Sequence, residues 1–196
     1  MAQKVILMIL DGWGLAPNPE VSAVDLAQTP NMDTWFDKYP HASLLTHGEN
    51  VGLPNGQMGN SEVGHMNLGA GRIVYQDLVK ISKAIEDKSV EKNQVLIDAL
   101  TYAQNQGKNL HFLGLLSDGG VHAHLDHLEG LLEMAAQFDV PQVFVHGFTD
   151  GRDVDPKSSV NYLRRLSQKL DQTQAKLASI TGRYYAMDRD KRWERV

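Results

Sequence analysis

The sequence predicts an α/β fold, with helices packed on a mainly parallel sheet in a three-layer α/β/α arrangement. Short, continuously apolar segments recur along the chain and end at polar turns, which is typical of strands buried in a parallel sheet. Segments with helical spacing alternate with these apolar segments. Such alternation is typical of a doubly wound sheet.

Four apolar segments are predicted to be strands. The first is VILMIL, residues 5–10, and the others lie in NLHFLGLLSDGG, PQVFVHGFTDGRD and AKLASITGR. They end at Asp11, Asp118, Asp150 and Arg183. Because ligands of open α/β sheets bind beyond the carboxyl ends of the strands, we expect polar chemistry to gather at these four ends. Any single Asp-Gly pair could instead form only a turn.

Two helix starts are marked by a capping residue followed by proline, at Thr29-Pro30 and at Asp155-Pro156. We expect a helix to begin at each of these prolines. Helical spacing also predicts helices in YQDLVKISKAIED, in NQVLIDALTYAQNQG, which closes at Gly107, and in HLDHLEGLLEMAAQF.

A junction between two domains is predicted at residues 73–77, where a glycine-rich stretch ends. It gives one domain of residues 1–75 and a second of residues 76–196. The sequence shows no fixed-period repeat and no low-complexity tract.

The composition excludes several classes of protein. The 196 residues carry a formal net charge of −5, which argues against a basic surface for nucleic acid or membrane. There is no cysteine, so a metal would have to bind Asp, Glu, His or Ser. The apolar run near the N-terminus is too short to span a membrane and lacks a cleavage pattern. We therefore expect a cytoplasmic protein without nucleic-acid or membrane partners.

Ser61 lies in the stretch MGNSEVGHMNLGAGR, residues 58–72. Serine and asparagine are common helix caps and turn residues, so Ser61 could be a cap, a loop residue or a nucleophile. The nucleophile elbow of serine hydrolases, G-x-S-x-G, does not match, because Val63 stands where the second glycine should be. The stretch alone leaves the alternatives open.

Histidines and arginines supply further candidates for chemistry. Of the histidines in HAHLDHL, only His122 is placed in a strand-end loop, whereas His124 and His127 could be metal ligands or solvated residues of a helix start. His41, His47 and His111 are left without a role. Guanidinium groups bind phosphate and carboxylate, so the strand-end arginines indicate a small anionic substrate. They are Arg152, Arg183 and Arg189. Arg152 could instead form a structural ion pair with Asp150 or Asp153.

Five motifs, in order along the chain, together resemble one family. They read ILDGWG, GQMGNSEVGHMNLGAGR, LLSDGGVHAH, FTDGRDVDP and TGRYYAMDRDKRWERV. They are similar to motifs of the cofactor-independent phosphoglycerate mutases, which belong to the alkaline phosphatase superfamily. The resemblance spans essentially the whole chain. It implies that residues 1–75 are the N-terminal part of a metal-binding phosphatase-like domain and that residues 76–196 are part of a substrate-binding transferase domain.

The resemblance also implies roles for individual residues. Asp11 would be a metal ligand, and Ser61 would be a nucleophile that coordinates the same metal and becomes phosphoserine. The residues that would hold or reorient the substrate are His122, Arg152, Asp153, Arg183 and Arg189. Asp153 would also exchange the proton of the glycerate hydroxyl. We expect folding to gather these groups into one crevice.

The activity that the resemblance implies is the interconversion of 3-phosphoglycerate and 2-phosphoglycerate in glycolysis and gluconeogenesis. The implied cofactors are two divalent metal ions, for which we expect Mn²⁺, without bisphosphoglycerate. The full-length form is expected to be a monomer whose partners are these small substrates.

Family members are longer than this chain and take most of their metal ligands from a segment beyond it. We therefore expect the chain to be an N-terminal portion with an incomplete metal centre and no turnover of its own. One alternative is another metal-dependent phosphatase or phosphomutase of the superfamily, which would share Asp11 and Ser61 but not the three arginines. A second is a phosphoglycerate-binding module without turnover.

Overall fold

A computed structural model of the chain describes residues 4–195. The chain divides into two compact units, Met1–Val74 and Tyr75–Val196. Helices and a parallel sheet are both present, which confirms the predicted α/β class. The identification of the two parts with a phosphatase-like and a transferase domain stays a prediction.

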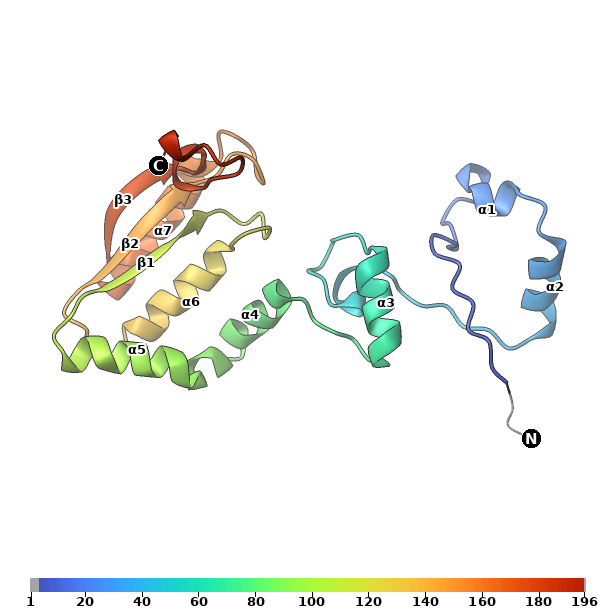
Figure 1. Cartoon of the computed structure of the whole chain (residues 1–196), viewed down its shortest axis with the longest axis horizontal. Helices are drawn as coiled ribbons and strands as arrows, with labels where there is room; N and C mark the ends of the chain where they lie inside the picture. The colour runs from blue at the N-terminus through green and yellow to red at the C-terminus, as the bar shows by residue number, and fades with distance from the viewer. Residues whose placement is uncertain (1–3, 196) are drawn as a thin grey trace. The chain divides into compact units, whose positions relative to one another are not determined.

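The unit Tyr75–Val196 is built on a three-stranded parallel sheet (Figure 1). Its strands are β1 (Leu110–Leu116), β2 (Val143–Thr149) and β3 (Lys176–Gly182), in that order across the sheet. Three of the four predicted strands are therefore confirmed. The last residues of the strands pair across the sheet, Leu116 with Thr149 and Thr149 with Gly182. The three carboxyl ends are therefore level.

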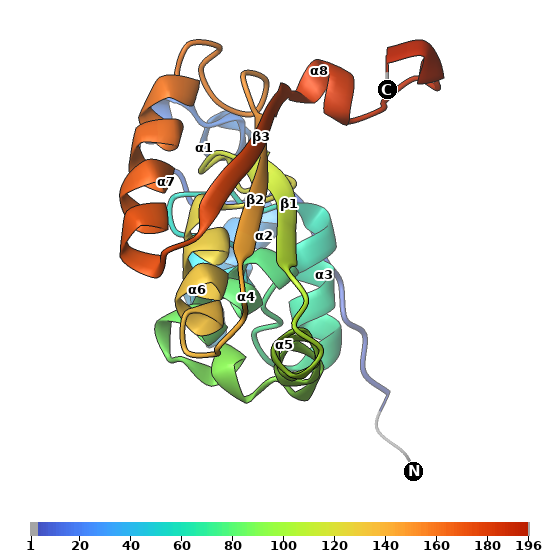
Figure 2. The ribbon, with the colours of Figure 1, turned by 90° about the vertical axis from the view of Figure 1, so that its left-hand side faces the viewer.

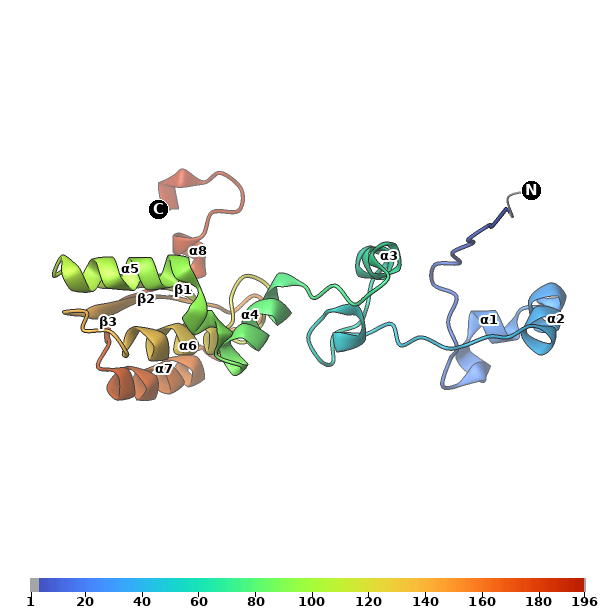
Figure 3. The same ribbon diagram turned by 90° about the horizontal axis from the view of Figure 1, so that it is seen from below.

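Two helices cover one face of this sheet. They are α6 (Leu125–Ala135) and α7 (Ser159–Thr173), which lie side by side on the same face in Figure 2 and Figure 3. Their Leu132 and Leu166 are almost fully buried against Val145 of β2 and join one hydrophobic cluster. A second helical layer on the opposite face, as a three-layer arrangement requires, stays a prediction.

Gly147 in β2 makes room for the core. A Cβ built on this glycine would lie 2.5 Å from Cδ1 of Leu116 in β1. Leu116 is 1% exposed and belongs to the hydrophobic cluster, and its side chain fills the space beside the glycine. Any larger residue at position 147 would push this side chain out of the core.

The remaining elements of this unit precede or follow the sheet. They are α4 (Asp77–Glu86), η3 (Ser89–Lys92), α5 (Gln94–Asn105), α8 (Arg183–Ala186) and η4 (Trp193–Arg195). Residues of α5, among them Leu100, join the same hydrophobic cluster. Gly107 follows α5 with a φ of +60°, as its predicted role in closing that helix requires.

The described residues of the unit Met1–Val74 form short helices joined by loops. These are η1 (Pro19–Val21), α1 (Ala23–Leu26), α2 (Pro30–Lys38), η2 (Gly48–Val51) and α3 (Ser61–Ala70). The predicted helix start at Pro30 is confirmed. A small cluster of Val51, Leu53 and Val63 holds η2 against α3.

Two sequence-based predictions are wrong in these residues. Residues 5–10 were expected to be a buried strand, but they form none, and Val5 and Ile6 are 88% and 89% exposed. A parallel strand needs a neighbouring strand to pair with, and the described part of this unit has none. The helix expected at Pro156 begins at Ser159, because the Asp155 side chain accepts from the backbone N–H of Lys157 and forms a turn first.

Among the helices in the described part of the chain, none combines the length and the apolar character that crossing a membrane would require.

Replacing Leu166 tests the packing of α7 on the sheet. Leu166 is 0% exposed, so Leu166→Ala should lower the free energy of unfolding by about 2–5 kcal/mol. Val160→Ala on the same helix is the matched control, because Val160 is 60% exposed and its loss should change stability by less than about 0.5 kcal/mol. Urea denaturation measures both. Equal losses in the two variants would contradict this packing.

Candidate functional site

A cluster of polar side chains lies at the carboxyl edge of the sheet. Each strand is followed directly by one of its members: Ser117 follows β1, Asp150 follows β2 and Arg183 follows β3. Because the strand ends are level, these three residues meet. The Ser117 hydroxyl and Nη1 of Arg183 both donate to the Asp150 carboxylate, over 2.7 and 2.8 Å. We refer to these residues, with Asp153 and His122, as the strand-end cluster.

The Asp150 carboxylate is the centre of the strand-end cluster. Its side chain is 0% exposed, and Oδ1 also accepts from the backbone N–H groups of Gly151, Arg152 and Asp153 at 2.8–3.2 Å. Burial alone would raise the pKa of this carboxyl. The hydrogen bonds outweigh burial and hold the pKa of Asp150 well below its ordinary value. Asp150 is therefore ionised at neutral pH.

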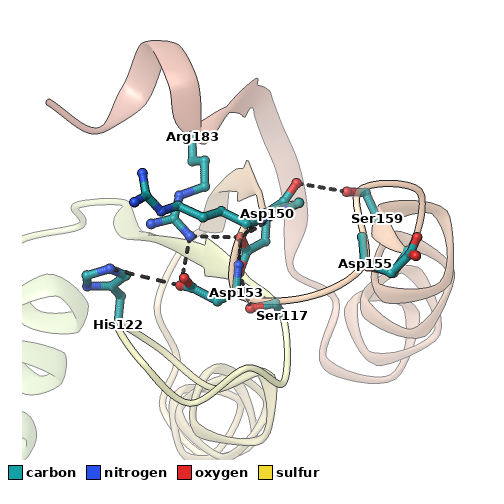
Figure 4. Close-up of polar contacts among 10 residues, drawn as sticks. Ser117, His122, Asp150, Asp153, Asp155, Ser159 and Arg183 are labelled. Carbon is teal, nitrogen blue, oxygen red and sulfur yellow. Dashed lines mark hydrogen bonds and ion pairs between the residues drawn. The ribbon is translucent and has the colours of Figure 1, made fainter. Parts of the chain in front are cut away.

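Three of the predicted substrate-binding residues come together beside Asp150 (Figure 4). Nη1 of Arg183 donates to Oδ2 of Asp153 over 2.7 Å, and the same oxygen lies 3.9 Å from Nε2 of His122. The Arg183 and Asp153 side chains are 14% and 11% exposed, whereas His122 is 44% exposed. The cluster therefore offers a guanidinium, a carboxylate and an imidazole within reach of solvent.

The structure does not join the other two predicted arginines to this cluster. Arg152 contributes its backbone N–H, but within residues 4–195 its side chain makes no ion pair, so the structural pair with Asp150 or Asp153 is not found. Arg189 is exposed in the segment after α8. Asp118 has a structural partner, since the hydroxyl of Tyr162 on α7 donates to it over 2.5 Å. This bond ties the loop that carries His122 to α7.

The neighbouring histidines act in the helix start rather than as a metal cage. Nδ1 of His124 accepts from the backbone N–H of Asp126 and caps α6. His127 lies 2.9 Å from the hydroxyl of Ser82 through Nε2. No group of three or more histidine and carboxylate side chains that could hold a metal is found among residues 4–195.

Ser61 lies in the other unit, at the first position of α3. The helix cap is Asn60, whose side chain accepts from the backbone N–H of Val63 over 3.1 Å, so Ser61 is not needed for capping. The Ser61 hydroxyl donates to Oδ2 of Asp11, a residue 50 positions earlier in the chain. Nδ1 of His65 lies 3.2 Å from the same hydroxyl and 2.8 Å from the Ser61 carbonyl oxygen. Because a carbonyl only accepts, Nδ1 of His65 carries the proton.

Gly59 fixes the backbone that leads into Ser61. A Cβ on this glycine would lie 1.8 Å from the carbonyl oxygen of Thr46, a distance that no side chain could adopt without moving the backbone. The glycine therefore lets two backbone segments come into contact just before the nucleophile candidate. This explains the glycine two positions before Ser61.

The residues present fit only part of a metal site. Asp11 and Ser61 place a carboxylate and a hydroxyl oxygen in contact, and hard oxygen donors of this kind suit divalent cations such as Mn²⁺. Two donors do not complete a coordination shell, and the described residues supply no further set. Asp11 and Ser61 could therefore supply two of the oxygen ligands that such an ion would need.

Sequence reasoning gave no site role to Ser117, Asp150 or His65. Asp150 was identified as a strand end, and Ser117 is the first polar residue after the apolar run of β1. The signal that could have found both is their common position directly after a strand, because residues at that position meet in a level parallel sheet.

Replacing Gly59 tests the contact that leads into Ser61. Gly59→Ala should lower the free energy of unfolding of this unit by about 1–3 kcal/mol, because the Thr46 carbonyl must move away. Gly69→Ala in α3 is the control, since nothing lies within 4 Å of its added Cβ, and it should leave stability unchanged or raise it by up to about 1 kcal/mol. Thermal unfolding measures both. A tolerated Gly59→Ala would contradict the contact.

Comparison with known proteins gives consistent results. The family model described as BPG-independent PGAM N-terminus matches residues 81–196. The chain is 62% identical over 196 residues to the 2,3-bisphosphoglycerate-independent phosphoglycerate mutase of Flavobacterium johnsoniae and 54% identical to that of Bacteroides fragilis. All of this chain is aligned in both cases, and it spans 39% of the length of each of these curated relatives.

A solved structure is similar as well. A crystal structure of Leishmania mexicana phosphoglycerate mutase at low cobalt concentration has a TM-score of 0.64 and 34% sequence identity. The match covers 96% of this chain and 36% of the Leishmania chain. The family model matches more than half of the chain, and the curated relatives and the Leishmania structure are also named phosphoglycerate mutases. The chain therefore belongs to the BPG-independent phosphoglycerate mutase family.

Proposed function

We propose that this chain is part of a phosphoglycerate mutase that interconverts 3-phosphoglycerate and 2-phosphoglycerate through a phosphoserine, without bisphosphoglycerate. The observation that carries the proposal is the contact of Arg183 with Asp153, beside His122, at the carboxyl edge of the sheet. This arrangement offers cationic donors and a proton acceptor together. The relatives also support the proposal, because they are named 2,3-bisphosphoglycerate-independent phosphoglycerate mutases.

Arg183 and His122 bind the anionic groups of the substrate in this proposal. A guanidinium can donate two parallel hydrogen bonds to a carboxylate or a phosphate, and an imidazole N–H can donate one more. Arg152 and Arg189 are exposed and add positive charge when the substrate is bound. Positioning and neutralisation of charge supply most of the catalysis in phosphoryl transfer.

Asp153 exchanges the proton of the glycerate hydroxyl. Its Oδ2 accepts from Arg183 over 2.7 Å, which fixes the carboxylate in a position from which it can take the proton of a bound hydroxyl. The same carboxylate can return the proton after the glycerate has turned. Isomerisation needs both steps, since the phosphoryl group leaves one oxygen of the glycerate and returns to the other.

Ser61 accepts the phosphoryl group. Its hydroxyl donates to Oδ2 of Asp11, which holds the oxygen in place. A divalent cation bound at these two oxygens would supply charge that favours the deprotonated serine, which is otherwise a weak nucleophile. We propose two such ions, Mn²⁺ by preference, with the remaining ligands outside this chain. His65 orients the start of α3 through the Ser61 carbonyl.

The active form in this proposal has the length of the relatives, of which this chain spans 39%. It is a cytoplasmic monomer, and this chain alone has no turnover, because Asp11 and Ser61 are the two metal ligands proposed among residues 4–195 and an ion needs more. A general phosphatase of the same superfamily would use Asp11 and Ser61 as well. Assaying the full-length protein with 3-phosphoglycerate and with a simple phosphate monoester separates the two, because only the mutase needs Arg183 and Asp153.

Replacing Ser61 tests the proposed nucleophile. In the full-length protein, Ser61→Ala should abolish interconversion of the two phosphoglycerates while leaving the fold intact, because Asn60 caps the helix. Ser43→Ala in an exposed loop of the same unit is the control and should retain wild-type turnover. Incorporation of phosphate into the protein, followed by mass spectrometry, should occur in wild type and in Ser43→Ala only. Turnover by Ser61→Ala would rule out the phosphoserine route.

A further inference from the structure

Asp150 contacts every strand end of the sheet but is closed off from solvent. Its side chain is 0% exposed, and its two oxygens accept five hydrogen bonds. A substrate cannot touch this carboxylate. Any effect of Asp150 on the reaction must therefore pass through the groups that it holds.

Within the described part of the chain, Arg183 is held through one guanidinium nitrogen. Nη1 carries two hydrogens, and it donates to Oδ1 of Asp150 over 2.8 Å and to Oδ2 of Asp153 over 2.7 Å. Both contacts lie on the same end of the planar guanidinium (Figure 4). The other edge, with Nε and Nη2, has parallel N–H groups, which is the geometry that binds two oxygens of a carboxylate or phosphate.

One oxygen atom sets the relative position of Arg183 and Asp153. Oδ1 of Asp150 accepts from the Arg183 guanidinium and also from the backbone N–H of Asp153, over 3.2 Å. The side chain of Asp153 then closes the triangle by accepting from the same guanidinium nitrogen. The anion-binding edge and the proton acceptor are thus fixed to one buried point.

We propose that Asp150 is a positioning residue of the phosphoglycerate site, which fixes Nη1 of Arg183 so that the Nε and Nη2 edge faces an anionic group of the substrate. This inference rests on the proposed function. It adds a residue that neither touches the substrate nor binds a metal. The ionised state of Asp150 strengthens the hold, since hydrogen bonds between charged partners are about twice as strong as neutral ones.

Asp150→Asn tests the proposal with little change of shape. The asparagine oxygen can replace Oδ1 and keep the backbone N–H groups of the loop, while its NH₂ group faces Ser117, whose hydroxyl can rotate and accept. The variant therefore loses the charge and keeps the fold. In the full-length protein, kcat/KM for 3-phosphoglycerate should fall about tenfold, mainly through a higher KM.

Leu132→Ala is the control for loss of stability. Leu132 is 1% exposed in the hydrophobic cluster and lies outside the strand-end cluster. The variant should lower thermal stability but change kcat/KM by less than about twofold, as expected if stability and positioning are separate. A tenfold loss of kcat/KM in this control would show that general loosening explains the effect, and would overturn the proposal.

A double-mutant cycle separates positioning from structure. Arg183→Lys keeps the positive charge, but lysine has no planar edge with two parallel donors. In that variant Asp150 therefore has no guanidinium edge to orient. Adding Asp150→Asn to Arg183→Lys should cost less than about twofold in kcat/KM. A further tenfold loss would overturn the proposal. If the wild-type protein itself does not interconvert the phosphoglycerates, the proposed function fails instead.

A measurement on the wild-type protein does not depend on any variant folding. In ¹⁵N NMR spectra of arginine side chains, a guanidinium that is held through one nitrogen rotates slowly and shows separate Nη1 and Nη2 signals. Arg183 should show this separation, and exposed Arg189 should show one averaged signal. A single averaged Nη signal for Arg183 would overturn the proposal.

Discussion

The carboxylate of Asp150 is the point at which the three strands of the sheet are joined at their carboxyl ends. Ser117, Asp150 and Arg183 each follow a strand directly, and level pairing of the strands brings them together. A buried carboxylate is stable only when donors surround it, and here five hydrogen bonds do so. The placement of Arg183, and of the loop after β2 that carries Asp153, depends on this one charge.

The two units contribute different groups to the proposed function. In Tyr75–Val196, the parallel sheet brings together groups that suit an anionic substrate. In Met1–Val74, a close backbone contact at Gly59 and the Asn60 cap position the Ser61 hydroxyl against Asp11. These two oxygen donors would need further ligands to hold a metal.

Much of the sheet could be predicted from the sequence, because strands buried in a parallel sheet are continuously apolar and stop abruptly. β1, β2 and β3 follow that pattern, and Asp150 and Arg183 were expected at the ends of β2 and β3. VILMIL follows the same pattern but forms no strand here, because hydropathy specifies burial and not the partner that provides it. The start of α7 was misplaced because the Asp155 turn competes with the helix for the same backbone N–H groups.

The site was predictable only in part, because the sequence does not specify which residues meet after folding. Motifs identify which residues carry chemistry, and they pointed to Ser61, Asp11 and Arg183. They say little about buried residues that hold these groups, since a serine after an apolar run could equally be an ordinary turn residue. The contact between Ser117 and Asp150 became visible only once the register of β1 and β2 was known.

The protonation state of Asp150 tests this account most directly. Its folded-state pKa is lowered, so its contribution to stability is present above the unfolded pKa of about 4 and is lost as the pH falls through the folded value. The ¹³C chemical shift of the Asp150 carboxyl, followed by NMR during acidification, should stay that of the ionised form to below about pH 3. Titration of this carboxyl in the folded protein near pH 4 or above would contradict the account, because a carboxylate held by five donors should not take up a proton there.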